Sequence, residues 1–296
     1  MRTYLDCFPC FLKQALEAGR IAGIKREDEQ KRLLCTIVRE IEKFSLKASP
    51  PEIGRIVHFW VRKSSKNPDP FKEIKKQSNH LALKLYPELK KEIENSAHKL
   101  LKAVKLSIAG NVIDYGANHL SPSLDKSLDS LSAHLKKTLK EIENQSLSCF
   151  EKFAKALKRA SIILYLADNA GEVVFDRLLL EELVSLKKQV IFAVRGAPII
   201  NDALIEDAYF CQIDRYAQIL SNGSDAPGTV LNLCSPDFIE AYQKADLVIS
   251  KGQGNFESLS EEKKQIYFLL KVKCSVLAQN IGAKIGSAVL IGRDGD

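Results

Sequence analysis

The feature that most constrains the fold is an alternation of short apolar runs with longer amphipathic runs, which begins at Ser161. The apolar runs are too short for independent helices and predict strands, whereas the amphipathic runs predict helices. Strand and helix in alternation are typical of a mostly parallel, doubly wound sheet, so we predict an α/β fold. The predicted strands are Ile162–Leu166, Val190–Val194, Leu247–Ile249 and Ser275–Ala278, and the predicted helices are Val173–Leu186, Pro236–Lys244 and Glu261–Lys271.

The first half of the chain carries apolar residues mainly at helical spacing, three or four positions apart. This spacing predicts an all-helical N-terminal half. The predicted helical runs are Phe11–Ala22, Arg26–Ser45, Ile53–Lys63, Phe71–Ile108 punctuated at Pro87, Ser127–Ile142 and Ser148–Ala160.

Composition excludes several classes of partner. The 44 Lys and Arg exceed the 37 Asp and Glu by a net charge of +7, which is compatible with phosphorylated ligands. The basic residues mostly alternate with Glu, so we predict no nucleic-acid partner. No apolar stretch approaches the roughly 20 residues that span a bilayer, and the first residues lack a signal-peptide core, so we expect no membrane association. An odd number of cysteines, seven, favours a reducing compartment, the cytoplasm.

Polar side chains follow the first three predicted strands. Asp168 and Asn169 follow the first, Arg195 and Asp202 the second, and Lys251 ends the third. In an open α/β sheet, ligands bind at the carboxyl ends of strands, so these side chains are expected to share one crevice. Carboxylate and carboxamide oxygens suit Mg²⁺ or Mn²⁺. Each signal has a structural alternative, because Asp and Asn are also common helix caps.

Lys251 stands between Ser250 and Gly252-Gln253-Gly254. A lysine can neutralise phosphate charge, and the N–H groups around the glycines can bind phosphate oxygens, although the glycines could also form only a tight turn. The chain has no Gly-x-Gly-x-x-Gly motif after a strand and no Walker lysine-serine pair. Binding of a dinucleotide and hydrolysis of a nucleotide by a P-loop are therefore not expected.

These motifs together resemble the metal-dependent damage-control phosphatases, a family long catalogued as domain of unknown function eighty-nine and related to proteins named acidic-residue methyltransferases. The short chain and its Cys7-Phe-Pro-Cys10 start resemble the compact prokaryotic branch. The resemblance rests on Asp168-Asn-Ala-Gly-Glu172, Pro198-Ile-Ile-Asn-Asp202, Ser224-Asp-Ala-Pro-Gly-Thr229, Lys251-Gly-Gln-Gly-Asn-Phe-Glu257, Asp69-Pro-Phe71 with Lys75 and Asn79, and Ala109–Gly116.

The resemblance implies a helical N-terminal domain over residues 1–158 and a Rossmann-like three-layer α/β/α domain over residues 159–296. It further implies a phosphatase that depends on Mn²⁺, Co²⁺, Ni²⁺ or Mg²⁺ and acts on sugar phosphates or damaged phosphometabolites. We expect attack by a metal-activated water, because the carboxylates are needed as ligands. The implied metal ligands are Asp168, Asn169 and Asp202, and Lys251 would bind the transferred phosphoryl group. Further substrate contacts are expected from Asn111, Asp114, Glu172, Arg195, Asp225, Asn255 and Glu257.

Cys7 and Cys10 form a Cys-x-x-Cys pair that leaves three interpretations open: packing thiols, a metal site or a redox site. A metal site would need further ligands, and Cys274, expected at the start of the last strand, is one candidate. His119 is the one histidine kept as a site candidate. Two rival functions also remain: an adenosylmethionine-dependent carboxyl methyltransferase, and a metal- or redox-sensing binding protein that is not an enzyme.

Overall fold

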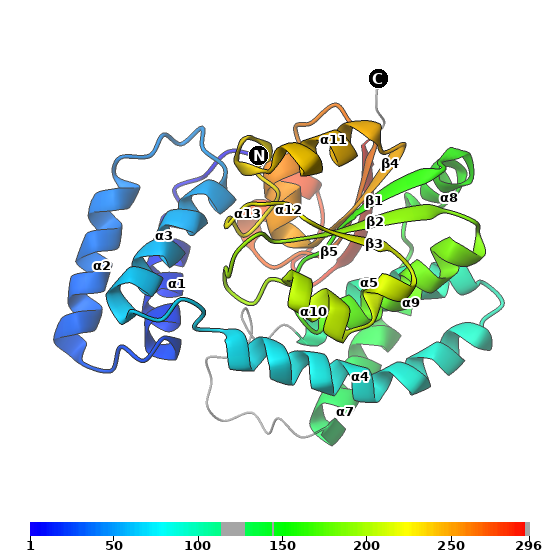
Figure 1. Ribbon diagram of the computed structural model, residues 1–296, viewed down its shortest axis with the longest axis horizontal. Helices are drawn as coiled ribbons and strands as arrows, with labels where there is room; N and C mark the ends of the chain where they lie inside the picture. The colour runs from blue at the N-terminus through cyan, green and yellow to red at the C-terminus, as the bar shows by residue number, and fades with distance from the viewer. Residues whose placement is uncertain (114–127, 144, 294–296) are drawn as a thin grey trace.

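A six-stranded sheet forms the centre of the molecule, in the order β3-β2-β1-β4-β5-β6 (Figure 1). The structure is a computed structural model that describes residues 1–113, 128–143 and 145–293. β6 runs antiparallel to β5, and the other neighbours are parallel. The strands are β1 (Ile162–Leu166), β2 (Gln189–Val194), β3 (Gln218–Ser221), β4 (Leu247–Lys251), β5 (Ile266–Lys271) and β6 (Ala288–Arg293).

Helices precede the sheet in sequence and then alternate with its strands. Those before β1 are α1 (Cys7–Ile21), α2 (Glu27–Ile41), α3 (Pro50–Ser65), α4 (Lys72–Glu94), α5 (Lys99–Ala109), the 3₁₀ helix η1 (Gly110–Ile113), α7 (Leu128–Glu143) and α8 (Phe150–Arg159). Those after β1 are α9 (Glu172–Ser185), α10 (Ile205–Phe210), η2 (Ile213–Arg215), η3 (Leu231–Leu233), α11 (Pro236–Lys244), α12 (Gly252–Leu259) and α13 (Ser275–Ile281). The predicted α/β class is therefore confirmed.

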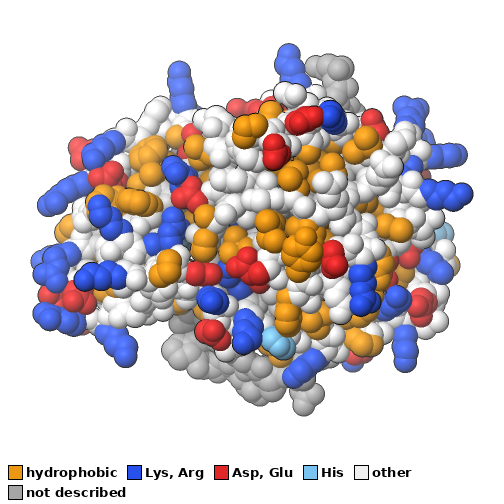
Figure 2. Space-filling model, viewed as in Figure 1, with side chains coloured by type: hydrophobic (Ala, Val, Ile, Leu, Met, Phe, Trp, Pro, Cys, Tyr) orange, Lys and Arg blue, Asp and Glu red, His pale blue; other side chains and the backbone are white. Residues whose placement is uncertain are grey.

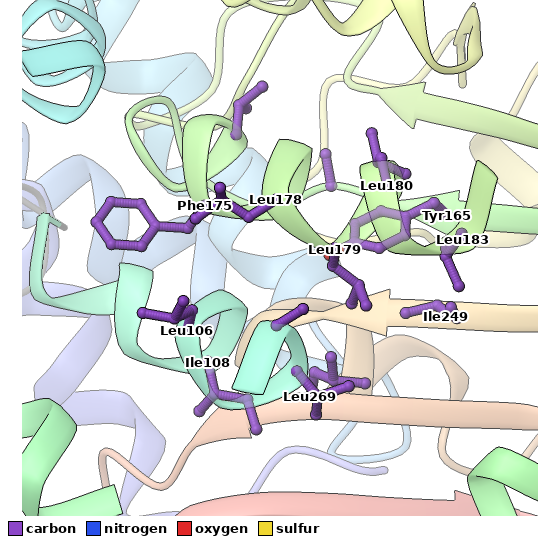
Figure 3. Close-up of a cluster of buried hydrophobic side chains, with 14 of the residues drawn as sticks. Leu106, Ile108, Tyr165, Phe175, Leu178, Leu179, Leu180, Leu183, Ile249 and Leu269 are labelled. Carbon is purple, nitrogen blue, oxygen red and sulfur yellow. The ribbon is translucent and has the colours of Figure 1, made fainter. Parts of the chain in front are cut away.

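Alternate residues of each strand face two separate helical layers. In β1, Ile163 and Tyr165 belong to one hydrophobic core, whereas Leu164 and Leu166 belong to another. The first core includes residues of α5, α8 and α9, several of which are labelled in Figure 3. The second includes residues of α11, α12 and α13. Because the central strands β1, β4 and β5 are buried on both faces, their sequences are largely apolar instead of alternating.

The helical half of the chain contributes to two cores. Helices α1, α2 and α3 have a core of their own and form a lobe at the left of Figure 1. Helices α4, α5, α7 and α8 instead share the core on the first face of the sheet. The domain boundary between residues 158 and 159 stays a prediction.

Two predicted elements near the C-terminus are wrong. Residues 261–271, predicted as a helix, contain β5, and Ser275–Ala278, predicted as a strand, lies in α13. Strands β3 and β6 were not predicted. A short apolar run fits either a buried strand or a buried helix turn, so periodicity cannot separate the two. The long run after Phe71 also divides at residues 95–98 instead of Pro87, which lies inside α4.

The surface view in Figure 2 shows charged side chains of both signs, with hydrophobic side chains exposed between them. On the face shown in Figure 2, Lys and Arg side chains are spread over the surface, with Asp and Glu among them. Within the described ranges, no helix has both the length and the apolar character required to cross a membrane.

Candidate functional site

The candidate site lies where the strand order of the sheet changes direction. β1 and β4 are parallel neighbours, with Leu166 paired to Ser250 at their carboxyl ends. The chain leaves β1 into α9 on one face and leaves β4 into α12 on the other. Such a divergence opens a crevice beyond the strand ends, the position at which ligands bind in open α/β sheets. Asp168 and Lys251 occupy this position.

Backbone hydrogen bonds join the loops that follow β1 and β2. The Ala170 N–H donates to Asn201 O at 2.9 Å, and the Ala203 N–H donates to Asp168 O at 2.8 Å. Asn169 and Asp202 consequently pair as an isolated β-bridge. This bridge places a carboxamide and a carboxylate, separated by more than thirty positions in sequence, side by side.

The loop after β2 contains an unusual backbone conformation beside this bridge. Ile200 has φ 45°, in the left-handed region. That region is disfavoured for a β-branched residue, and such conformations concentrate at functional sites. Ile200 also lines the cavity described below, as does Asp202.

Arg195 hydrogen-bonds one carboxylate of the site and lies near the other. Its Nε donates to Asp202 Oδ2 at 2.7 Å, and its Nη2 lies 3.9 Å from Asp168 Oδ1. Its Nη1 donates to Thr229 Oγ1 at 3.3 Å. The Arg195 side chain is buried, so it acts on these carboxylates from within the protein.

The carboxamide of Asn169 is oriented by two neighbouring carboxylates. Asn169 Nδ2 donates to Glu172 Oε1 at 2.9 Å and to Asp168 Oδ2 at 3.2 Å. A carboxamide has two donors on nitrogen and an acceptor on oxygen, so two anionic acceptors determine which end faces them. The oxygen Oδ1 is then the atom of this carboxamide that could serve as a ligand to a cation.

Lys251 lies beneath this loop and is fully buried. Its Nζ donates to Ser107 O at 3.0 Å, to Glu172 Oε2 at 3.2 Å and to Asp176 Oδ1 at 2.6 Å. Burial opposes the charge of Lys251, but Asp176 and Glu172 outweigh that effect and raise its pKa. All three N–H donors of the ammonium group are thus directed at protein oxygens.

The site has an excess of buried negative charge. Burial, together with Glu172 and Asp202, raises the pKa of Asp168 well above its usual range, and Lys273 opposes this shift. A bound divalent cation would relieve the repulsion that causes it. The carboxylates are Asp168, Glu172, Asp176 and Asp202; Arg195 donates to Asp202, and Lys251 donates to Glu172 and Asp176.

The donor set fits a hard divalent cation. Two carboxylates and a carboxamide oxygen meet in the β-bridged loops, and Mg²⁺ and Mn²⁺ prefer such oxygen ligands. Across the part of the chain that the structure describes, no group of three His, Cys, Asp or Glu side chains is arranged to hold a metal ion. A metal site here therefore depends on Asn169 as the third ligand.

A cavity of about 470 Å³ lies between helix α1 and these loops. Asp168, Asn169, Asp202 and Lys273 are among the residues that line it. Part of the lining is apolar and includes Phe11 of α1. The cavity therefore combines a polar end, which carries the candidate cation ligands, with partly apolar lining that can contact the remainder of a ligand.

The three candidate cysteines line this same cavity. Cys7 and Cys10 lie in the first turns of α1, and burial raises the pKa of each thiol. Cys274 was expected at the start of a strand, but it caps α13, where its Sγ accepts from Leu277 N at 3.4 Å. Their role as a metal or redox site stays a prediction.

The remaining predicted contacts occupy different places. Asn111 Nδ2 donates to Glu172 Oε1 at 2.8 Å, at the base of the site. Asn255 is buried and ties loops together, since its Nδ2 donates to Ala167 O at 3.0 Å and its Oδ1 accepts from Thr229 at 2.8 Å. Glu257 lines the cavity.

Asp225 is paired with arginines of the helical lobe. It accepts hydrogen bonds from Arg55 and Arg62 of α3, the latter at 3.3 Å. It is not among the residues that line the cavity, and its role as a substrate contact stays a prediction. Asp114 and His119 lie outside the described residues.

Sequence reasoning missed two charged residues of the site. Lys273 follows β5 and reaches the crevice because β5 is parallel to β4; it was overlooked because β5 was assigned to a helix. Asp176 lies four residues after Glu172 on α9. Residues four apart share a helix face, so this acidic pair at the start of a largely apolar helix was a signal for Asp176.

Comparisons with known proteins cover nearly the whole chain. A model of the damage-control phosphatase ARMT1-like domain matches residues 3–289. An uncharacterized protein of Methanocaldococcus jannaschii is 38% identical over 297 residues, which are 97% of this chain and 94% of that protein. A protein of Pyrococcus horikoshii named a damage-control phosphatase is 32% identical over 291 residues, which are 98% of this chain and 97% of that protein.

A solved structure has the same fold. The crystal structure of a DUF89 family protein from Pyrococcus horikoshii superposes with a TM-score of 0.87 at 32% identity. The superposition covers 99% of this chain and 100% of the other.

Proposed function

The chain belongs to the damage-control phosphatase ARMT1-like family, as its motifs predicted, and on that premise we propose that it is a metal-dependent phosphatase of small phosphorylated metabolites. The observation that carries the proposal is the meeting of Asp168, Asn169 and Asp202 in one cavity at the switch point of the sheet. That position combines ligands for a cation with space for a phosphorylated substrate.

The proposed metal ligands are the carboxylates of Asp168 and Asp202 and the carboxamide oxygen of Asn169. A divalent ion, when bound, supplies the charge that polarises a phosphoryl group and acidifies an attacking water. Arg195 holds the Asp202 carboxylate, and Glu172 orients the carboxamide. These residues thus keep the ligands in place before any cation or substrate arrives.

The phosphoryl group of the substrate is proposed to lie between this site and the start of α12. The first N–H groups of a helix have no acceptor within the helix and favour anions. In α12 they belong to Gly252, Gln253 and Gly254. Lys273 adds a cation on the cavity wall. Lys251, the predicted phosphoryl contact, could reach an oxygen of the substrate only by releasing one of its three protein acceptors.

The test is phosphate release from a generic phosphoester and then from a panel of sugar phosphates. Metal-stripped protein receives Mn²⁺, Co²⁺, Ni²⁺ or Mg²⁺ in turn, beside the variant Asp168→Ala and the control Asp214→Ala, an exposed residue of η2. We expect turnover only with metal and a loss of at least ~100-fold in Asp168→Ala, because a metal supplies several kcal/mol of transition-state stabilisation. The control should retain wild-type turnover.

Folded protein that releases no phosphate with any of the four metals would contradict the proposal. Binding of adenosylmethionine would then be measured next, since a methyltransferase is the rival enzyme. Metal-independent turnover that survives in Asp168→Ala would contradict the assigned site, although the protein would still be a phosphatase.

A further inference from the structure

Asp176 is a fully buried carboxylate that the proposed chemistry does not use directly. It lies one helical turn after Glu172 on α9. Its Oδ1 accepts hydrogen bonds from Lys251 Nζ at 2.6 Å, Tyr165 OH at 2.7 Å and Ser107 Oγ at 2.8 Å. A buried charge is disfavoured unless it is paired and hydrogen-bonded, and at Asp176 the Lys251 ammonium group supplies the paired charge while Tyr165 and Ser107 donate further hydrogen bonds to the same oxygen.

A continuous chain of contacts leads from Asp176 to the proposed metal ligands. Lys251 Nζ, held by Asp176, also donates to Glu172 Oε2 at 3.2 Å. The other oxygen of that carboxylate, Oε1, accepts from Asn169 Nδ2 at 2.9 Å and from Asn111 Nδ2 at 2.8 Å. Each member of the chain therefore fixes the position of the next.

The orientation of the Asn169 carboxamide decides whether this residue can bind a cation. Only the oxygen is a ligand; with the group rotated by half a turn, the NH₂ would face the cavity and repel a cation. The Glu172 carboxylate favours the productive orientation because it accepts only from the nitrogen. Glu172 can do so only while Oε1 stays beside Asn169.

We infer that Asp176 is a positioning residue: through Lys251 and Glu172 it holds Asn169 with its carboxamide oxygen toward the cavity. The inference rests on the proposed metal-dependent function. The Lys251 ammonium group is hydrogen-bonded to Asp176 as well as to Glu172. Because Asp176 neutralises part of its charge, the ammonium group does not attract both oxygens of Glu172. Without that second carboxylate, Glu172 turns toward Lys251 and its hold on Asn169 weakens.

The experiment measures Mn²⁺ binding in the absence of substrate, by electron paramagnetic resonance of free Mn²⁺, and checks folding by thermal unfolding. Asp176→Asn keeps the shape of the side chain and removes its charge. Replacing a residue that orients metal ligands typically weakens metal affinity by ~10–100-fold. We therefore expect the dissociation constant for Mn²⁺ to rise by a factor within that range. The matched control Tyr165→Phe removes one hydrogen bond to the same oxygen but keeps the Asp176 charge, so its effect should stay within about threefold.

A second variant separates positioning from simple electrostatics. Loss of any nearby negative charge weakens cation binding, and loss of a nearby positive charge strengthens it. Lys251→Gln removes a positive charge but also removes the ammonium donor that holds Glu172 Oε2 in place, so the chain between Asp176 and Glu172 is broken. Positioning predicts a dissociation constant raised by ~10-fold or more, whereas electrostatics alone predicts a lower one. This variant also decides the question if Asp176→Asn does not fold.

An unchanged Mn²⁺ affinity in folded Asp176→Asn, or tighter binding in Lys251→Gln, would overturn the inference. Wild-type protein that binds no Mn²⁺ would overturn both the inference and the metal dependence proposed above. Mn²⁺ binding that responds to the variants as expected, in a protein that hydrolyses no phosphoester, would refute only the proposed function.

Discussion

Gly252 lies against the Asp168 carboxylate so closely that a Cβ atom at Gly252 would be 1.9 Å from Asp168 Oδ2. Gly252 also has φ 78°, a backbone conformation that residues other than glycine rarely adopt. The glycine that begins α12 thus allows the end of β4 to approach the loop after β1. The proposed metal ligand Asp168 occupies the space that a side chain at residue 252 would fill.

Gly252→Ala should abolish metal-dependent turnover, because the methyl group displaces the Asp168 carboxylate. The left-handed backbone strain should also lower the free energy of unfolding by about 1–2 kcal/mol. Turnover and urea denaturation measure the two effects separately. Gly282→Ala is the matched control, since Gly282 has φ 72° with no atom within 4 Å of the added Cβ. It should lose similar stability and keep its turnover; equal activity in both variants would contradict the contact.

Glu257 should make stability depend on pH. Burial raises the pKa of this carboxyl from 4.5 to about 7, although the hydrogen bond from Gln253 opposes the shift. The folded state then holds a proton that the unfolded state has released between these two pH values. Stability therefore falls as pH rises from about 4.5 through about 7.

Replacing Glu257 by Gln removes this dependence. The free energy of unfolding of Glu257→Gln, relative to wild type, should increase by about 1–2 kcal/mol between pH 5 and pH 8, with allowance for solvent screening. Denaturation at several pH values measures it. The comparison with wild type is needed because other groups, such as Asp168, also have a raised pKa. A difference that does not vary with pH would show that Glu257 titrates normally.

Cys7 and Cys10 should be dispensable for hydrolysis. Burial raises the pKa of both thiols, so at neutral pH they are protonated, whereas the thiolate is the form that attacks and binds metals. The double variant Cys7→Ser, Cys10→Ser should keep its metal-dependent turnover within about threefold. Phosphate release and metal content of the purified protein are the measurements. Loss of turnover together with loss of a bound metal would instead support the thiol metal site.

Asp225→Asn should affect stability more than chemistry. The ion pairs of Asp225 with Arg55 and Arg62 connect α3 to the loop after β3, and all three side chains are partly exposed. Partly exposed ion pairs contribute about 1 kcal/mol or less to stability. We therefore expect the free energy of unfolding to fall by that amount or less, with kcat unchanged. Denaturation and steady-state kinetics measure these. A tenfold fall in kcat would support the prediction that Asp225 contacts substrate.

Local patterns predicted the elements that carry strong local signals. The predicted helix Pro236–Lys244 has the bounds of α11; in the structure Ser235 caps this helix and Pro236 lies in its first turn. The Ile162–Leu166 run was predicted as β1, since a polar turn and an amphipathic helix follow it. The β5 region has no such capping or turn residues at its boundaries, and it was wrongly predicted as a helix. Because of that error, Lys273 was not recognised as a site residue and Cys274 was expected at the start of a strand.

The sequence by itself determined the α/β class, the strand-end positions of Asp168, Asn169 and Asp202, and the family to which the chain belongs. These depend on short-range patterns and on motif residues whose order is visible along the chain. The tertiary structure decided which groups meet: the β-bridge between Asn169 and Asp202, and the burial of Lys251 between Glu172 and Asp176. Contacts between segments distant in sequence depend on sheet order and helix packing, which no local pattern of side chains encodes.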